Sequence, residues 1–165
     1  MIILGIDPGI AIVGYGIIEY KNNKFRVIDY GAVTTNANTP TDQRLALVYK
    51  GIDILIKKYD IDEVAIEELF FNKNVKTAIT VAQARGVIML ACTHNSKPIY
   101  EYTPLQVKQG VVGYGRAQKM QVQQMVTSLL KLKEIPKPDD TADALAIAVC
   151  HALANRLEKT LKNFK

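Results

Sequence analysis

The first nine residues place the strongest constraint on what this chain can fold into. Residues 2–6 are apolar apart from one glycine and predict a buried strand, which ends by presenting Asp7. Pro8 and Gly9 then stop the strand and turn the chain. A carboxylate at the end of a buried strand needs a cation or hydrogen-bond donors to replace its lost hydration. Asp7 therefore either binds the amides of a turn or belongs to a functional site.

Length and composition predict one globular domain that spans residues 1–165. Hydrophobic residues make up 48% of the chain and charged residues 22%, which excludes a disordered protein. No apolar stretch approaches the ~20 residues needed to cross a bilayer, and the N-terminus carries no secretory signal pattern. Two lone cysteines, Cys92 and Cys150, supply neither a disulfide framework nor a zinc site. We therefore expect a cytoplasmic protein with buried, reduced thiols.

Positive charge is concentrated in one part of the chain. The net charge is +5, and residues 102–133 contain no Asp or Glu while they include Lys108, Arg116 and Lys119. Glycines interrupt the same segment, so its backbone can follow phosphate groups, although the full pattern of a nucleotide-binding P-loop is missing. A basic surface beside acidic residues favours a polyanionic ligand, with nucleic acid as the leading candidate. The alternative is a basic face that is simply solvated.

Periodicity predicts an α/β chain with a mixed sheet and helices on its faces. The first three strands form an antiparallel meander. Thr41 or Asp42 can cap the first helix, and Thr103 with Pro104 can begin a later one. In chain order we expect strands at 2–7, 10–20 and 25–35, a helix at 42–59, a strand at 61–67, a helix at 75–93, a strand at 98–102, and helices around 104–109, 122–130 and from 139 onward.

Further carboxylates follow the pattern set by Asp7. Glu67 ends the strand at 61–67. We prefer Glu67 to Glu68 as the functional carboxylate, because alternate strand residues face the same side and Glu68 would point away. Asp140 and Asp143 are three residues apart at the start of the last helix, so both face one way and can share a ligand. Acids at a helix N-terminus are also ordinary caps, which is the alternative for this pair.

Together these acids predict metal-dependent chemistry. In sheets of this kind functional residues gather at strand ends, where Asp7 and Glu67 meet if their strands are neighbours. Oxygen ligands suit Mg²⁺ or Mn²⁺, and two such ions about 3.5 to 4 Å apart activate a water and stabilise a leaving 3′-oxygen. The sequence therefore predicts phosphodiester hydrolysis.

Two other features have open interpretations. Phe70 and Phe71 are adjacent aromatics among polar residues, so one can stack on a base, although packing in the core is the commoner role. Arg85 can serve either DNA or a protein partner. It lies beside a stripe of small residues that can pack against the sheet or against the same helix of a second subunit: Ala78, Ala82 and Gly86.

Six short segments occur along the chain in this order: ILGIDPG (3–9), AIE (65–67), QARG (83–86), QVKQ (106–109), KMQV (119–122) and DTADALA (140–146). Together they closely resemble the RuvC family of Holliday junction resolvases. The resemblance covers nearly the whole chain in the right order, and the combination of segments is very specific.

The resemblance implies an RNase H-like fold with a mixed five-stranded sheet and helices on both faces. It also implies a homodimer that makes Mg²⁺-dependent paired nicks in opposed strands of a four-way DNA junction, during homologous recombination and DNA repair. The products would be ligatable duplexes with 5′-phosphate and 3′-hydroxyl ends. Two ions per active site are expected, with Mn²⁺ as the alternative metal, and a branch-migration helicase complex of the RuvA/RuvB type as a partner.

The family's site residues carry over by position. Some relatives use His at the third carboxylate position, which is Asp140 here, and Asp139 and Glu68 are neighbouring acids outside the family pattern. The catalytic and metal-binding carboxylates match Asp7, Glu67, Asp140 and Asp143. The DNA-contacting lysines match Lys108 and Lys119, and the aromatic that stacks at the junction centre matches Phe70. Further DNA-binding candidates are Lys73, Arg85 and Arg116, and the candidate dimer interface is the stripe Ala78, Ala82 and Gly86.

Other classes of protein fit less well. Actin-like and sugar-kinase-like ATPases also have an Asp and a Gly after their first strand, but they need two such domains and a second phosphate loop. An RNase H-like nuclease acting on RNA-containing substrates remains an alternative on grounds of fold. A junction-binding module without catalysis is disfavoured because all four carboxylates are present.

Overall fold

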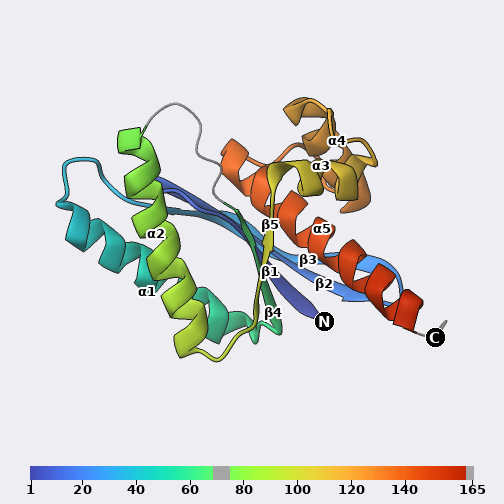
Figure 1. Cartoon of the computed structure of the whole chain (residues 1–165), viewed down its shortest axis with the longest axis horizontal. Helices are drawn as coiled ribbons and strands as arrows, with labels where there is room; N and C mark the ends of the chain where they lie inside the picture. Colours follow the sequence, from blue (N-terminus) through green and yellow to red (C-terminus); the bar gives the residue numbers. More distant parts are fainter. Residues whose placement is uncertain (69–74, 163–165) are drawn as a thin grey trace.

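The computed structural model describes the backbone of residues 1–68 and 75–162 and the side chains of residues 1–68 and 78–156. Its elements follow the predicted order of strands and helices. They are β1 (Ile2–Asp7), β2 (Ile12–Lys21), β3 (Lys24–Thr34), α1 (Thr41–Tyr59), β4 (Glu63–Glu67), α2 (Val75–His94), β5 (Ile99–Tyr102), α3 (Pro104–Val112), α4 (Lys119–Leu129) and α5 (Asp139–Lys162). Figure 1 shows α1 and α2 on one side of the sheet and α3, α4 and α5 on the other.

The five strands form one mixed sheet in the order β3-β2-β1-β4-β5. The chain begins with the predicted antiparallel meander of β1, β2 and β3. β4 then joins the other edge of β1 in parallel, with Ile66 opposite Ile6, and β5 joins β4 in parallel. Because β1 and β4 are parallel neighbours, their carboxyl ends meet at the same edge of the sheet. The sheet predicted from the sequence is confirmed.

Alternating side chains of β1 bury two different cores. Leu4 and Ile6 join the cluster beneath α1 and α2, whereas Ile3 joins the cluster beneath α5. β4 follows the same rule, because Ile66 belongs to the first cluster and Ala65 to the second. By this alternation, the last residues of both strands continue the series that faces α5.

Glycines in the sheet allow α5 to approach the strands very closely. A Cβ atom on Gly14 would lie 2.0 Å from the carbonyl oxygen of Asp140, and one on Gly5 would lie 2.1 Å from that of Ala144. A Cβ on Gly16 would lie 2.6 Å from Leu145. No side chain fits in this space, so glycine is required where helix and sheet touch. The three glycines set the height of α5 above the ends of β1 and β4.

Hydrogen bonds to β3 and to the residue before the helix also hold the first turn of α5 in place. The hydroxyl of Thr141 donates to the carbonyl of Gly31 on β3 at 3.0 Å, and its amide donates to the carbonyl of Pro138 at 2.9 Å. Thr141 is fully buried between the two acids of the predicted pair. These bonds hold Asp140 and Asp143 over the sheet.

The structure also tests the predicted helix caps and the predicted state of the cysteines. α1 begins at Thr41 with Pro40 as its N-cap and no side-chain cap, so the predicted cap by Thr41 or Asp42 is wrong. Thr103 caps α3 as predicted, in a reciprocal capping box with Gln106. Both cysteines are buried and free, as predicted. No helix within the described residues combines the length and apolar character needed to cross a membrane.

Candidate active site

β1 and β4 end side by side, and each ends with a carboxylate. Burial, together with the neighbouring charges of Glu67, Asp143 and Asp140, raises the pKa of Asp7 from its ordinary 3.8 to about 8. Burial also raises the pKa of Glu67, and the charge of Asp143 adds to that effect. Glu68, in contrast, is exposed. The carboxylates that the sequence placed at two separate strand ends lie close enough to repel each other.

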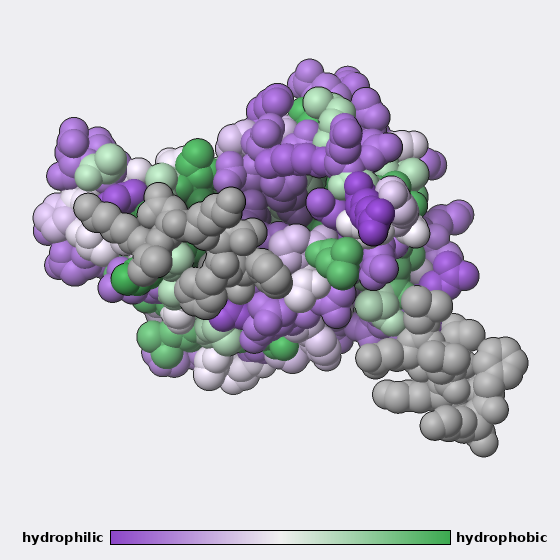
Figure 2. Space-filling model, turned by 45° about the horizontal axis from the view of Figure 1, so that its top comes forward, coloured by the Kyte–Doolittle hydropathy of each residue, from purple (hydrophilic) through white to green (hydrophobic). Residues whose placement is uncertain are grey.

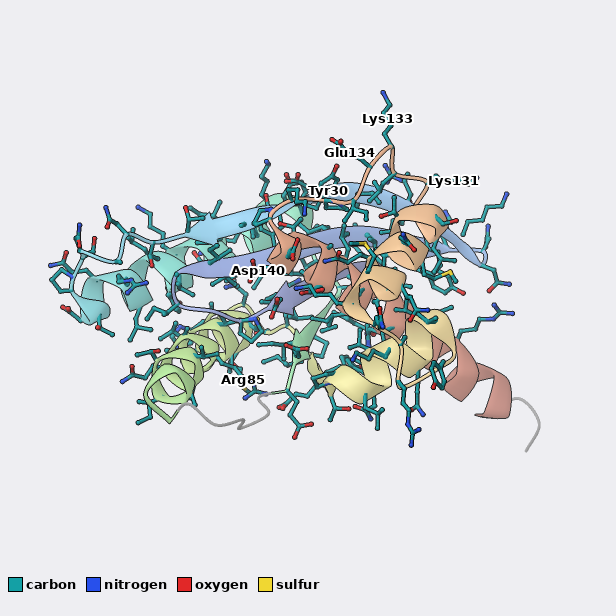
Figure 3. The ribbon with its side chains drawn as sticks, turned by 90° about the horizontal axis from the view of Figure 1, so that it is seen from above. Tyr30, Arg85, Lys131, Lys133, Glu134 and Asp140 are labelled. Carbon is teal, nitrogen blue, oxygen red and sulfur yellow. The ribbon has the colours of Figure 1, made fainter. Side chains whose placement is uncertain are left out.

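The other two carboxylates come from the first turn of α5. Burial raises the pKa of Asp143, and the charge of Asp140 adds to this. Figure 3 shows Asp140 at the start of α5. Its charge raises the pKa of both Asp7 and Asp143, so it belongs to the same cluster. The structure thus brings together all four carboxylates that the sequence selected.

A lysine partly neutralises this acidic cluster. The Nζ atom of Lys119, at the start of α4, lies 2.8 Å from Asp143 and 3.6 Å from Asp139. Although burial alone lowers the pKa of Lys119, the hydrogen bond and charge of Asp143 raise it overall. The ammonium group also lowers the pKa of Asp7 and Asp143. The carboxylates therefore attract a cation to the position of the Lys119 ammonium group.

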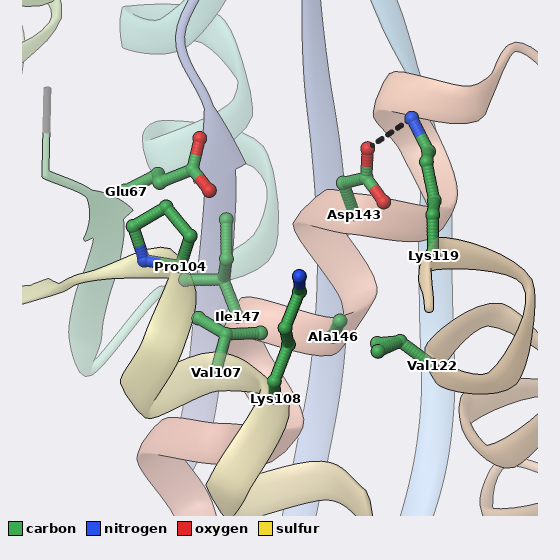
Figure 4. Close-up of a pocket in the computed structure, with 9 residues that line it drawn as sticks. All are labelled: Glu67, Pro104, Val107, Lys108, Lys119, Val122, Asp143, Ala146 and Ile147. Atoms are coloured by element: carbon green, nitrogen blue, oxygen red, sulfur yellow. Dashed lines mark ion pairs between the residues drawn. The ribbon is translucent and has the colours of Figure 1, made fainter. Parts of the chain in front are cut away.

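An open pocket of about 220 Å³ adjoins the carboxylates. Figure 4 shows Glu67 and Asp143 at its mouth and Lys108 reaching up between them, with Lys119 paired to Asp143. Lys108 is half-buried. The floor of the pocket is apolar and is formed by Pro104, Val107, Val122, Ala146 and Ile147. This arrangement can receive a polyanion whose non-charged part lies against the apolar floor.

Among the described residues, no three Asp, Glu, His or Cys side chains surround one point closely enough to form a ready metal cage. The ammonium group of Lys119 lies beside one of these carboxylates, Asp143. The donor chemistry nevertheless fits a hard divalent cation, because the cluster offers only carboxylate oxygens. Burial and, after it, repulsion between the acids raise the pKa values of Asp7 and Glu67, and a bound cation would offset both effects. The residues present therefore fit Mg²⁺ or Mn²⁺.

The remaining predicted residues lie in different surroundings. Arg116 is exposed and is not part of the pocket lining. Arg85 is paired with Glu101 rather than open to solvent. Phe70 and Lys73 lie outside the described residues. On α2, the stripe is partly exposed, and a Cβ atom on Gly86 would meet nothing within 4 Å.

The surface around the site is suited to a polar ligand. Figure 2 shows a largely hydrophilic face with a hollow near its middle, and hydrophobic residues are scattered over that face rather than gathered in one patch. Such a surface favours contacts to charged backbone groups of a ligand over a large apolar interface.

Sequence reasoning missed two groups of residues that build the site. The apolar floor comes from α3, α4 and α5, and no local pattern connects these helices. The close approach of α5 did have a signal, because Gly14 and Gly16 alternate within one strand and glycine in a strand indicates close contact.

Comparison with solved structures defines the class of protein. A structure described as Thermus thermophilus RuvC in complex with Holliday junction substrate has a TM-score of 0.92 and 36% sequence identity, and the match covers 96% of each chain. A second structure of Thermus thermophilus RuvC has a TM-score of 0.88 and 37% identity. The sheet and the helices on its faces therefore belong to an RNase H-like fold of the resolvase type.

Sequence comparison identifies the family. The family model described as "Crossover junction endodeoxyribonuclease RuvC" matches residues 3–151. A protein of that name from Clostridioides difficile is 79% identical over 99% of this chain and 96% of its own length. One from Alkaliphilus oremlandii is 60% identical over 98% of this chain and 99% of its own length. The chain belongs to the RuvC family of crossover junction endodeoxyribonucleases.

Proposed function

We propose that this chain is a divalent-metal-dependent endonuclease that resolves four-way DNA junctions. It would make paired nicks in opposed strands and leave 5′-phosphate and 3′-hydroxyl ends, during homologous recombination and DNA repair. The observation that carries the proposal is the cluster of Asp7, Glu67 and two acids of α5 beside a pocket with two lysines. Membership of the RuvC family supports the choice of substrate.

The four carboxylates would act as the metal ligands. When bound, two Mg²⁺ ions, or Mn²⁺ in their place, would supply an activated water and stabilise the leaving 3′-oxygen. Asp7 and Glu67 are held rigidly because each ends a buried strand, and Asp140 and Asp143 are held by the buried first turn of α5. This rigid support keeps the scissile phosphate in one orientation relative to the attacking water.

The two lysines of the pocket would hold the DNA backbone. Lys108 already extends between Glu67 and Asp143, within the pocket that the phosphate would enter. Lys119 forms an ion pair with Asp143. If a metal ion neutralises that carboxylate instead, Lys119 lies close enough to pair with a phosphate. Contacts of this kind position DNA without reading its bases, so junction binding should weaken steeply with salt.

We also propose a homodimer, because a four-way junction presents two strands for symmetric cutting. The candidate interface is the outer face of α2, where large apolar side chains are exposed beside the stripe of Ala78, Ala82 and Gly86. Ile79 is 54% exposed and Leu90 is 46% exposed, and α1 adds Leu47 at 48%. Ala82→Arg should convert dimer to monomer in sedimentation at low micromolar concentration, and an unchanged mass would remove α2 as the interface.

The cellular setting follows from the same proposal. A nuclease for four-way junctions would work in the cytoplasm beside the chromosome, with a branch-migration helicase of the RuvA/RuvB type supplying junctions. Phe70 and Lys73 lie outside the described residues. Phe70 remains the candidate for stacking at the junction centre, and Lys73 remains a further candidate for DNA binding. Arg116 remains a candidate for phosphate contacts because it is exposed and precedes Lys119 closely in the chain.

The deciding experiment compares three end-labelled substrates in Mg²⁺: a four-way junction, a matched linear duplex and an RNA/DNA hybrid. We expect symmetric nicks in the junction alone, and Asp7→Asn should abolish them while junction binding persists. Cutting of the hybrid instead would keep the nuclease chemistry and overturn the substrate. Binding of the junction without cutting by the wild-type protein would favour a module without catalysis.

A further inference from the structure

Arg85 is a basic residue that is mostly buried and already engaged by other groups of the protein. Its side chain is 16% exposed, and Figure 3 shows it on α2. One guanidinium nitrogen, Nη2, forms an ion pair with the carboxylate of Glu101 on β5. The Nε atom donates to the backbone carbonyl of Glu67 at 3.4 Å. Arg85 therefore connects α2 to the end of the strand that presents Glu67.

The peptide group between Glu67 and Glu68 is held at both of its polar atoms. Its carbonyl accepts from Arg85, and its N–H donates to the carbonyl of Tyr102 at 2.8 Å. The pairing of β4 with β1 reaches only Ile66, so β1 does not support this peptide group. Because a peptide group is planar and includes the preceding Cα atom, holding both atoms fixes the position of the Cα atom from which the Glu67 side chain leaves the backbone.

Glu101 keeps the guanidinium group in place. It lies opposite Ile66 in the pairing of β5 with β4, next to the strand end that Arg85 supports. The pair is a charge-assisted hydrogen bond, and the mostly buried guanidinium loses less of this attraction to water than a surface group would. An arginine held in this way cannot swing out to a phosphate without giving up both contacts.

We infer that Arg85, anchored by Glu101, is a positioning residue for Glu67 rather than a ligand of DNA. The inference rests on the proposed function, in which Glu67 is a metal-binding carboxylate. Groups that orient metal ligands change metal affinity or activity by about 10- to 100-fold when they are removed. Arg85 therefore controls how well the site holds its metal and how fast it cuts, and it leaves junction affinity nearly unchanged.

The experiment uses the full chain with Arg85→Gln, Glu101→Gln and a matched control, Arg26→Gln. Arg26 also pairs with a glutamate, Glu19 at 2.8 Å, but its side chain is 68% exposed. For each variant we would measure junction affinity without divalent metal, the single-turnover cutting rate during a Mg²⁺ titration, and Mn²⁺ binding without DNA by electron paramagnetic resonance.

For Arg85→Gln we expect a cutting rate about 10- to 100-fold lower, weaker Mn²⁺ binding, and a junction affinity close to that of the control. Glu101→Gln should change the rate in the same direction by a smaller factor. A folded Arg85→Gln with normal Mn²⁺ binding and rate but weaker junction binding would overturn the inference. Tighter junction binding by Glu101→Gln with an unchanged rate would also overturn it, because it would mean that the released arginine binds DNA.

One further variant and one further measurement separate a failure of this inference from a failure to fold and from a failure of the proposed function. If Arg85→Gln does not fold, Arg85→Lys keeps the charge and the pair with Glu101 but lacks the second nitrogen that holds Glu67. It should then fold and bind Mn²⁺ more weakly than the wild type, and normal Mn²⁺ binding would refute the role. If the wild-type protein cuts no junction, the proposed function fails, while Mn²⁺ binding without DNA still tests the positioning of Glu67.

Discussion

Removing the charge of Asp7 should stabilise the metal-free protein, although Asp7 is a proposed catalytic residue. Burial and three neighbouring acids raise the pKa of Asp7 to about 8, so its ionised form is unfavourable in the folded state. Asp7→Asn keeps the shape of the side chain without the charge. Its amide can also donate to Glu67, to which Asp7 is already hydrogen-bonded.

The effect should depend on pH with a definite sign. The carboxyl has a pKa of 3.8 when unfolded and about 8 when folded, so between these values the folded chain binds more protons. Wild-type stability therefore falls as the pH rises through this window. One pKa unit corresponds to ~1.4 kcal/mol, so the shift sets a ceiling of about 6 kcal/mol. Water at the site and proton sharing with Glu67 reduce this value.

A third of the ceiling, about 2 kcal/mol, corresponds to a rise of about 4 to 8 °C in melting temperature for a chain of this size. The assay is thermal unfolding in EDTA at about pH 5 and about pH 8.5, where the gap between Asp7→Asn and the wild type should widen with pH. Asp60→Asn is the control, because Asp60 is exposed and has a positive φ of 49° that asparagine tolerates. An Asp7→Asn protein no more stable than the wild type at the higher pH would refute the reasoning.

Two further predictions concern the supports of the cluster. Lys119→Met should lower the free energy of unfolding in EDTA at neutral pH by about 1 kcal/mol, because Lys119 is 55% exposed and the ion pair is partly screened; urea unfolding with an unchanged midpoint would contradict this. Gly14→Ala would place a Cβ atom 2.0 Å from the Asp140 carbonyl, so it should cost about 1 to 3 kcal/mol and slow junction cutting. Gly86→Ala, whose Cβ atom meets nothing within 4 Å, should not lower monomer stability, and equal losses in both variants would refute the role of Gly14.

The sheet and its two acidic strand ends were predictable because they depend on local periodicity. Alternation along a strand decides which face a side chain takes, and it separated Glu67 from the exposed Glu68 correctly. The spacing of Asp140 and Asp143 placed both in one helical turn, and their effect on the pKa of Asp7 shows that this turn reaches β1. These conclusions needed only the order of elements and the assumption that β1 and β4 are neighbours.

The supports of the site were not predictable in the same way, because they join residues far apart in the chain. Arg85 and Glu101 are 16 residues apart, one on a helix and the other on a strand. Without knowledge of that partner, the sequence suggests that Arg85 is a surface cation suited to DNA. Lys119 reads as a phosphate contact, whereas in the folded chain it first neutralises Asp143. A charged residue in sequence has no visible partner, and only the packing of elements shows whether it is available to a ligand.

The same packing offsets the free-energy cost of gathering the carboxylates. Burial and the charges of neighbouring carboxylates raise the pKa values of Asp7, Glu67 and Asp143, so the site opposes folding on its own. Two apolar clusters, one on each face of the sheet, and the close contact of α5 with the glycines offset this cost. Because a ligand that binds only the folded state stabilises it, a divalent cation should raise the stability of this protein most where the carboxylates repel most, at pH above about 8. Metal affinity and the instability of the free site are thus two results of one arrangement of charges.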